Sequence, residues 1–223
     1  MPVEQHISKL LCALGKRLPL VGPVWRRLNK PIYALRAKRL LRSRRSESVP
    51  VKLELGAGKK RGTHGWVTVD MTRECDLFWD LKWGLPFPDD SIAAIYSSHL
   101  LEHFSYAELQ ALLKECLRVL VPGGEFSACV PDVAFYMRGY LSPHEFDREA
   151  HIGHIEGFKY LSPIDCLNYV AYMGGHHLHM FDIDGLIGVL RHSGFRSVHQ
   201  IDFDGRINLE ERRIGSIYAM AIK

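Results

Sequence analysis

From residue 51 onward, short segments with strand character alternate with segments of helical periodicity, and this alternation constrains the fold more than any other feature. Apolar residues at helical spacing predict an amphipathic helix over about Ala107–Leu120. Strands are predicted at Val51–Leu55, Trp66–Val69, Ile92–Tyr96 and Glu125–Val130. Strands that alternate with helices form a mainly parallel sheet covered on both faces. The chain is therefore expected to be an α/β protein.

The second half of this region is less regular. A turn is expected at residues 122–124, and residues 133–180 show no clear periodicity but are rich in aromatic residues and histidine. Phe181–His192 indicates a helix, and Ser197–Ile201 and Ser216–Ile222 indicate the last two strands. The region from 51 to the end thus has enough elements for one domain.

The first 50 residues differ sharply in charge from the rest. They carry 12 Lys and Arg against two acidic residues, whereas the remaining 173 residues carry 17 basic and 23 acidic ones. A short amphipathic helix is predicted over Ile7–Leu14, and a second basic stretch over Val24–Arg45, where Pro31 is expected to kink or restart the helix. Residues 43–50 are expected to be a linker. The chain divides into a basic helical arm at 1–50 and a domain at 51–223.

Three roles are open for this arm: a solvated tail, a contact with an anionic membrane surface through residues 1–45, or a contact with nucleic acid. Leu, Trp and Tyr interleaved with Arg suit a helix that lies at a membrane interface. The charge also suits phosphates, but no recognisable RNA-binding module accompanies it. Nucleic acid is therefore the weaker of the three alternatives.

The cysteines and the apolar runs indicate the compartment. No apolar run reaches the 18 residues that a membrane-spanning helix needs. The five cysteines are scattered and never spaced as CxxC, which argues against a disulfide framework or a zinc finger and fits a reducing compartment. We expect a cytoplasmic protein, peripheral at the inner membrane if the arm binds lipid. A secretory signal is not expected, while a mitochondrial presequence stays open.

A glycine-rich turn after the first strand indicates a ligand site. The sequence LELGAGKK places Gly56 and Gly58 where a strand turns into the next segment, and Asp70 ends the following strand. Ligands of parallel sheets bind at the carboxyl ends of the strands, and a carboxylate there accepts hydrogen bonds from a ribose diol. Arg61 stands where the dinucleotide fingerprint needs glycine, and no P-loop spacing is present. A nucleoside ligand without phosphates is favoured.

With these residues the sequence resembles the class I S-adenosylmethionine-dependent methyltransferases, and among them the small bacterial ones linked to surface-polysaccharide synthesis. The resemblance covers residues 51–223 and depends on an ordered series of motifs. These are LELGAG (53–58), WVTVD (66–70), residues 80–103, residues 112–126 and residues 179–195. It implies a Rossmann-like sheet of seven mostly parallel strands with a C-terminal antiparallel pair, and S-adenosylmethionine as cofactor.

The resemblance also implies the cofactor-binding residues, in four groups along the chain. The turn would border the methionine part, the end of the second strand would hold the ribose, residues 80 and 81 would lie by the adenine, and the end of the fourth strand would face the sulfonium. In chain order these residues are Glu54, Gly56, Ala57, Gly58, Asp70, Met71, Asp80, Leu81, Ser98 and His99. Lys59, Lys60 and Arg61 depart from the family pattern, which has small residues there.

Hydroxyl acceptors need a general base, and histidines are the candidates. His99 is the first choice because its position at a strand end should face the methyl group. His177 and His179 are alternatives because they precede the last helix. Residues 133–180 would form the lid and the acceptor wall, with aromatic side chains that also suit a small packed helical unit. These aromatics are Phe135, Tyr136, Tyr140, Phe158, Tyr160, Tyr169 and Tyr172.

A metal site is an alternative use of the histidines. His99, Glu102 and His103 are spaced to share one helical face, and His177 or His179 would complete a divalent site. The spacing resembles the metal-binding E-x-x-E-H pattern of ubiquinone-pathway and small-RNA methyltransferases, with histidine in place of the first glutamate. Because Leu-Glu-His is also common in metal-free relatives, we expect no metal. A pair at residues 151 and 154 has no carboxylate or cysteine partner and is weaker still.

The sequence therefore predicts an enzyme that methylates an oxygen of a saccharide or another small-molecule intermediate. One alternative is an RNA or protein methyltransferase that the basic arm guides to its substrate. Another is a non-catalytic subunit that only binds the cofactor, because a fold and its motifs do not guarantee an activity.

Overall fold

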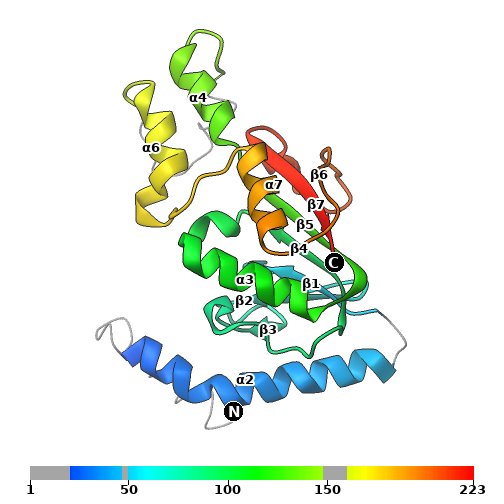
Figure 1. Cartoon of the computed structure of the whole chain (residues 1–223). Helices are drawn as coiled ribbons and strands as arrows, with labels where there is room; N and C mark the ends of the chain where they lie inside the picture. The colour runs from blue at the N-terminus through cyan, green and yellow to red at the C-terminus, as the bar shows by residue number, and fades with distance from the viewer. Residues whose placement is uncertain (1–20, 47–49, 148–159) are drawn as a thin grey trace.

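The computed structural model describes residues 21–46, 50–147 and 160–223. The helix predicted near the N-terminus, the middle of the predicted linker, Phe158 and the histidines at 151 and 154 lie outside these ranges. The described part is built around one sheet of seven strands in the order β3-β2-β1-β4-β5-β7-β6 (Figure 1). The strands are β1 (Lys52–Leu55), β2 (Trp66–Asp70), β3 (Leu77–Phe78), β4 (Ile92–Ser98), β5 (Leu120–Pro131), β6 (Val198–Gln200) and β7 (Ser216–Ile222).

The directions of the strands confirm the predicted Rossmann-like α/β fold. β1 pairs in parallel with both β2 and β4, β3 extends the sheet beyond β2, and β5 pairs in parallel with β4. β7 is inserted antiparallel between β5 and β6. The order of the strands reverses at β1, and the carboxyl ends of β1, β2 and β4 meet at one edge. This edge is where ligands of open α/β sheets bind.

Two regular helices pack over the sheet. α3 (Tyr106–Val119) begins with a capping box formed by Ser105 and Glu108, and its apolar face is buried in the core. α7 (Ile183–His192) begins at Asp182, whose carboxylate accepts a hydrogen bond from a backbone N–H of the first turn. Both helices were predicted within a few residues. The turn predicted at residues 122–124 is instead part of β5, next to a register shift against β4.

The segment predicted as irregular contains two short helices that pack on each other. These are α4 (Val133–Leu141) and α6 (Ile164–Tyr172), which stand together beyond one end of the sheet in Figure 1. Tyr136, Cys166 and Val170 form a small core between them, joined by Phe135, Tyr160 and Tyr169. Most of the aromatic residues described here therefore pack within this helical pair.

The described part of the basic arm is a single helix, α2 (Val21–Ser46), which continues through Pro31. Tyr33, Ala37 and Leu41, spaced at i, i+4 and i+8, are buried in the main core. The ring of Tyr33 lies 4.9 Å from that of Phe78 in β3. This helix is docked on the edge of the sheet, so the interpretation of the arm as a solvated tail is wrong for this part. Among the described residues, no helix is both long and apolar enough to cross a membrane.

Candidate functional site

The turn after β1 needs glycine for two different reasons. Gly56 and Gly58 both have positive φ angles, 70° and 64°, which residues with a side chain rarely adopt. A Cβ atom at Gly56 would also lie 2.7 Å from Cδ1 of Leu100, whereas one at Gly58 would have nothing within 4 Å. The turn is held by the Gly56 N–H, which donates to the carbonyl of Val69 at 2.9 Å.

Asp70 connects this turn to the end of β2. One carboxylate oxygen accepts a hydrogen bond from the Gly58 N–H and the other from the Thr72 N–H, both at 2.9 Å. Each oxygen of a carboxylate has more than one acceptor site. Asp70 therefore still has acceptor capacity toward the cavity that it lines.

Two of the three basic residues that depart from the family pattern have acidic partners. Lys60 forms an ion pair with Glu54 at 3.1 Å, and Arg61 one with Asp76 at 3.4 Å. Asp76 also accepts hydrogen bonds from backbone N–H groups of Gly62 and Thr68, at 2.8 and 3.1 Å. Burial acts to raise the pKa of Asp76, but these hydrogen bonds outweigh it, and the pKa lies below the ordinary value. Two of the three bases thus hold the loop in place.

A cavity of about 440 Å³ opens beside this turn. Five of the predicted cofactor residues line it: Gly56, Asp70, Met71, Asp80 and Leu81. Seven further residues line the cavity and could not be assigned to it from the sequence: Trp79, Lys82, Leu100, His103, Phe104, Gly175 and His176. Glu54, Ala57, Gly58, Ser98 and His99 border the region but are outside this lining. The volume is within the range of about 300–1,000 Å³ that is usual for small-molecule sites.

An aromatic side chain in the cavity lining, Trp79, is held in place by its contacts. The indole N–H of Trp79 donates to the carbonyl of Gly84 at 2.6 Å, and its ring packs edge-on against Trp83. The carboxylate of Asp80 accepts a hydrogen bond from the backbone N–H of Lys82. On the outer side, Lys30 of α2 lies about 6 Å from both indole rings, at 6.0 and 5.7 Å. The docked arm thereby supports this end of the cavity.

The polar residues at the end of β4 make contacts on the side of β7. The hydroxyl of Ser98 accepts a hydrogen bond from Arg212 at 2.7 Å. His99 has a positive φ of 50°, and its Nε2 lies 2.9 Å from the hydroxyl of Ser216. Burial, with the nearby Arg212 charge, lowers the pKa of His99 to about 3. Such an imidazole stays neutral at neutral pH but holds an abstracted proton weakly, so its role as the base stays a prediction.

Glu102 is the most unusual polar residue near the cavity. It lies in the short helix η2 (Leu101–His103), is only 2% exposed, and neither carboxylate oxygen has a hydrogen-bond partner within the described ranges. Burial raises its pKa to about 7, against the opposing effects of its own backbone N–H and of Arg212. Its backbone carbonyl accepts hydrogen bonds from the N–H groups of Leu178 and His179, at 2.8 and 3.1 Å.

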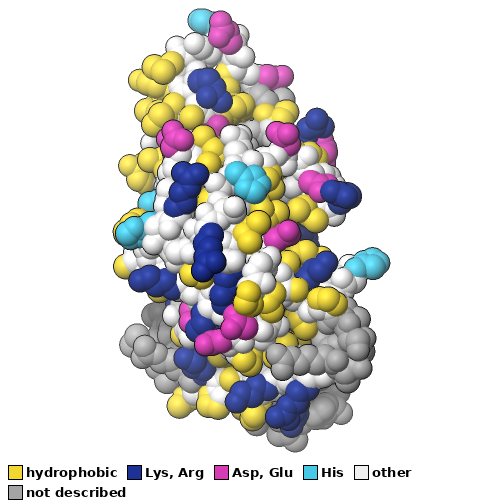
Figure 2. All heavy atoms as spheres, turned by 45° about the vertical axis from the view of Figure 1, so that its right-hand side comes forward, with side chains coloured by type: hydrophobic (Ala, Val, Ile, Leu, Met, Phe, Trp, Pro, Cys, Tyr) yellow, Lys and Arg dark blue, Asp and Glu magenta, His cyan; other side chains and the backbone are white. Residues whose placement is uncertain are grey.

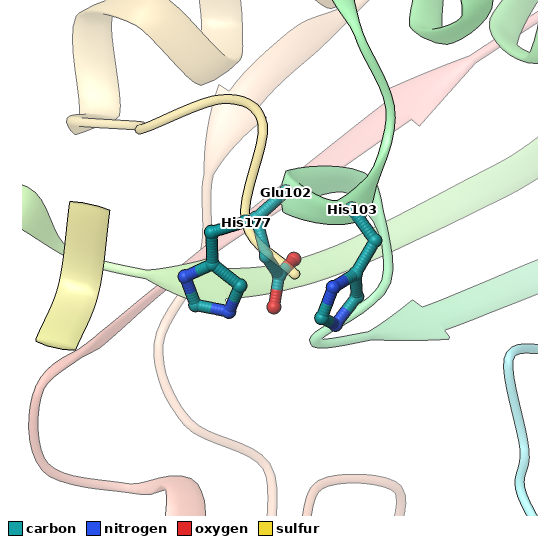
Figure 3. A group of neighbouring side chains, drawn as sticks. All are labelled: Glu102, His103 and His177. Carbon is teal, nitrogen blue, oxygen red and sulfur yellow. The ribbon is translucent and has the colours of Figure 1, made fainter. Parts of the chain in front are cut away.

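Two histidines flank this carboxylate. Nδ1 of His103 lies 3.0 Å from the carbonyl oxygen of His176, and Nδ1 of His177 lies 2.7 Å from that of Val170. One ligand atom from each of Glu102, His103 and His177 lies within 4.8 Å of the other two. Figure 3 shows the carboxylate between the two imidazole rings. Burial lowers the pKa of His177, so this ring is neutral at neutral pH.

Of the three predicted bases, only His177 belongs to this cluster. His179 packs its ring 4.6 Å from that of Phe181, and burial lowers its pKa. His99 is bonded to Ser216, and none of the three lines the cavity. His103 does line it. Its position directly after Glu102, in the Leu-Glu-His sequence at residues 101–103, is the sequence signal that could have identified it.

Comparison with known proteins agrees with this geometry. Residues 55–128 match the sequence model of a family described as a methyltransferase domain. No curated protein sequence matches the chain. The match covers about a third of the chain, and together with the strand order and the cavity beside Asp70 it supports a methyltransferase that uses S-adenosylmethionine as its cofactor.

Solved structures of three methyltransferases are similar to this chain. One is an S-adenosylmethionine-dependent methyltransferase from Archaeoglobus fulgidus, with 16% identity, 84% of this chain and 94% of that chain covered, and a TM-score of 0.48. Another, from Mesorhizobium loti, has 20% identity, 78% and 92% coverage, and a TM-score of 0.47. The third is phosphoethanolamine N-methyltransferase 2 from Haemonchus contortus in complex with S-adenosylmethionine, with 14% identity, 78% and 48% coverage, and a TM-score of 0.48. These likenesses do not extend to the substrate.

Proposed function

We propose that this enzyme methylates a hydroxyl oxygen of a saccharide or another small polar molecule. The observation that carries the proposal is the group of proton-accepting side chains at one end of the cavity, made by His103 with Glu102 and His177 behind it. A neutral hydroxyl is a poor nucleophile and must lose its proton as it attacks, whereas a neutral amine attacks without prior deprotonation. A cluster of this kind therefore suits an oxygen acceptor.

The other end of the cavity fits the cofactor. S-adenosylmethionine supplies a methyl group on a positively charged sulfur that is itself the leaving group. Asp70 would hold the ribose hydroxyls with its free acceptor sites, and Asp80, Leu81 and Trp79 would border the adenine. Gly56 lets the backbone approach without a side chain. The chain's task is then to align the acceptor oxygen with the methyl group and to exclude water.

The experiment is methyl transfer from labelled cofactor to a panel of saccharide intermediates, followed by mass spectrometry of the products. We expect a product that carries one additional methyl group on oxygen. His103→Gln should lower kcat while leaving cofactor affinity within about threefold, because His103 is proposed to face the acceptor and is not one of the proposed cofactor residues. Turnover on RNA or protein alone, or methylation of nitrogen only, would contradict the proposal.

We also propose that the outer face of α2 contacts an anionic membrane surface. Leu28, Ile32 and Leu35, at helical spacing, are 73%, 51% and 55% exposed. Exposed basic residues lie on and beside this stripe: Arg36, Lys38, Arg39 and Arg42. Figure 2 shows Lys and Arg over the lower part of the molecule, where α2 lies in Figure 1. Apolar residues framed by cations are typical of helices that lie in a membrane interface.

Vesicle flotation tests this contact. The protein should float with vesicles that contain anionic lipid and not with neutral ones, and exchange of Leu28 and Ile32 for Ser should abolish flotation. Binding to RNA that persists at physiological salt, with no affinity for anionic vesicles, would favour the nucleic-acid alternative instead.

A further inference from the structure

The buried carboxylate of Glu102 needs a compensating partner that the described residues do not supply. It is 2% exposed and both of its oxygens lack a hydrogen-bond partner within the described ranges. Burial of a carboxylate without a partner is costly, and buried charges in proteins are normally paired or coordinate metals. An unpartnered oxygen pair between two imidazoles is therefore suited to bind a cation or to carry a proton.

The backbone contacts of the two imidazoles determine which ring nitrogen carries the lone pair. A carbonyl oxygen only accepts hydrogen bonds, so the Nδ1 atoms of His103 and His177, which contact carbonyls at 3.0 and 2.7 Å, must carry the hydrogens. In the neutral ring the other nitrogen, Nε2, then carries the lone pair. A backbone carbonyl that fixes the tautomer in this way is the usual outer partner of a metal-binding histidine.

We propose that Glu102, His103 and His177 bind a divalent transition-metal ion. Their ligand atoms lie within 4.8 Å of one another, and donors at about 2.1 Å from one ion lie roughly 3 Å apart, so small side-chain rotations close the site. Two imidazoles with one carboxylate favour Mn²⁺, Fe²⁺, Co²⁺ or Zn²⁺ over Mg²⁺ and Ca²⁺, which prefer oxygen ligands only. His99 is excluded because its ring is turned toward Ser216.

The position of the cluster gives the ion a role in the reaction. His103 lines the cavity together with Gly175 and His176, so an ion held by this cluster would lie beside the space that an acceptor is proposed to enter. Three protein ligands with an open position are typical of catalytic rather than structural sites. An acceptor hydroxyl bound there would have a lowered pKa, which replaces a strong general base. This consequence depends on the proposed function, whereas the binding of the ion does not.

The test is a Co²⁺ titration of the full chain after treatment with a chelator, followed by visible absorption and elemental analysis. We expect one ion per chain in the wild type. Glu102→Gln, His103→Gln and His177→Gln should each weaken the apparent affinity by more than about 100-fold, because loss of an outer partner alone costs 10–100-fold. Glu102→Gln replaces the carboxylate by a neutral group of the same shape and is the variant most certain to fold.

Two control variants make the result specific. His199→Gln removes an exposed imidazole on β6, and the double variant His151→Gln/His154→Gln removes the pair outside the described ranges. Both should bind Co²⁺ as the wild type does. The proposal is overturned if the wild type binds no ion, if the three site variants bind it equally well, or if only the double variant loses it. No acceptor is needed, so a failure of saccharide methylation does not affect this test.

Discussion

Exchange of Gly56 or Gly58 for Ala separates backbone strain from crowding at the cofactor turn. Both residues have a positive φ, so each substitution places a side chain in the left-handed region. The two positions differ in what the new Cβ meets. At Gly56 it lies 2.7 Å from Cδ1 and 3.1 Å from Cβ of Leu100, and at Gly58 it meets nothing within 4 Å.

The structure gives different magnitudes for the two variants. The left-handed conformation costs a residue with a Cβ about 1–2 kcal/mol, which is the whole expected loss for Gly58→Ala. Gly56→Ala adds the cost of an overpacked contact, about 1–3 kcal/mol, because the Leu100 side chain is crowded at its base as well as its tip. At roughly 2–4 °C for each kcal/mol in a chain of this size, a 2 kcal/mol difference lowers Tm by a further 4–8 °C.

Thermal unfolding measures the loss of stability in each variant, and calorimetry with S-adenosylmethionine measures the change in cofactor affinity. Gly56→Ala should also raise the Kd for the cofactor by about tenfold or more, because Gly56 and Leu100 both line the cavity. Equal losses of Tm in the two variants would refute the predicted clash between a Cβ at residue 56 and the Leu100 side chain. An unchanged cofactor Kd in Gly56→Ala would show that the cavity beside this turn is not the cofactor site.

Three further predictions concern the arm, the ribose site and pH. Leu41→Ala should destabilise the protein by about 2–5 kcal/mol in urea unfolding, whereas Leu35→Ala on the same helix should change it by less than about 0.5 kcal/mol, because Leu41 is 5% and Leu35 55% exposed; equal effects would mean that α2 is not docked. Asp70→Asn should raise the cofactor Kd measured by calorimetry by about tenfold or more, since one charged acceptor oxygen is lost; an unchanged Kd would rule out its contact with the ribose. Asp76 has a lowered pKa in the folded state, so its stabilising contribution is present above its ordinary pKa and is lost as the pH falls through the folded value. Asp76→Asn should therefore lower Tm at pH 7 and approach the wild type at acidic pH; a pH-independent difference would contradict this.

The sheet could be predicted because its strands are short apolar runs bounded by clear turns. The position of Asp70 at the end of β2 followed from the same pattern, and the structure places it on the cavity. β3 could not be predicted, because Leu77–Phe78 is too short to show any periodicity. It becomes a strand only through its pairing with β2 and its contact with α2.

The docking of α2 on the sheet could not be predicted from the composition of the arm. Apolar residues occur on two faces of α2, one formed by Tyr33, Ala37 and Leu41 and the other containing Leu28 and Ile32. Hydrophobic periodicity identifies a buried stripe only when the remaining faces are polar. The sequence therefore left a tail, a membrane helix and a contact with nucleic acid open, and only the contact with β3 shows which face is inside.

The histidines show where reasoning from position alone fails. His99 follows β4 as expected, but its left-handed backbone turns the ring toward Ser216, which is 117 residues away in the sequence. His177 reaches Glu102 because the chain returns after α6 and is fixed by two hydrogen bonds to the Glu102 carbonyl. Neither long-range contact leaves a local pattern in the sequence, so the choice among the histidines required the structure.

The two ends of the cavity depend on different parts of the chain. The proposed cofactor side contains the turn after β1 and residues 79–82, with Lys30 of α2 near Trp79. The proposed acceptor side contains His103 and Phe104 together with residues 175–176, and only residues 175–176 belong to the insertion that contains α4 and α6. Since the insertion is joined to this wall through the carbonyl of Glu102, changes in the helical pair would alter the acceptor end without moving Asp70. If the acceptor is bound on this side as proposed, substitutions in α4 and α6 should change acceptor preference while cofactor binding is retained.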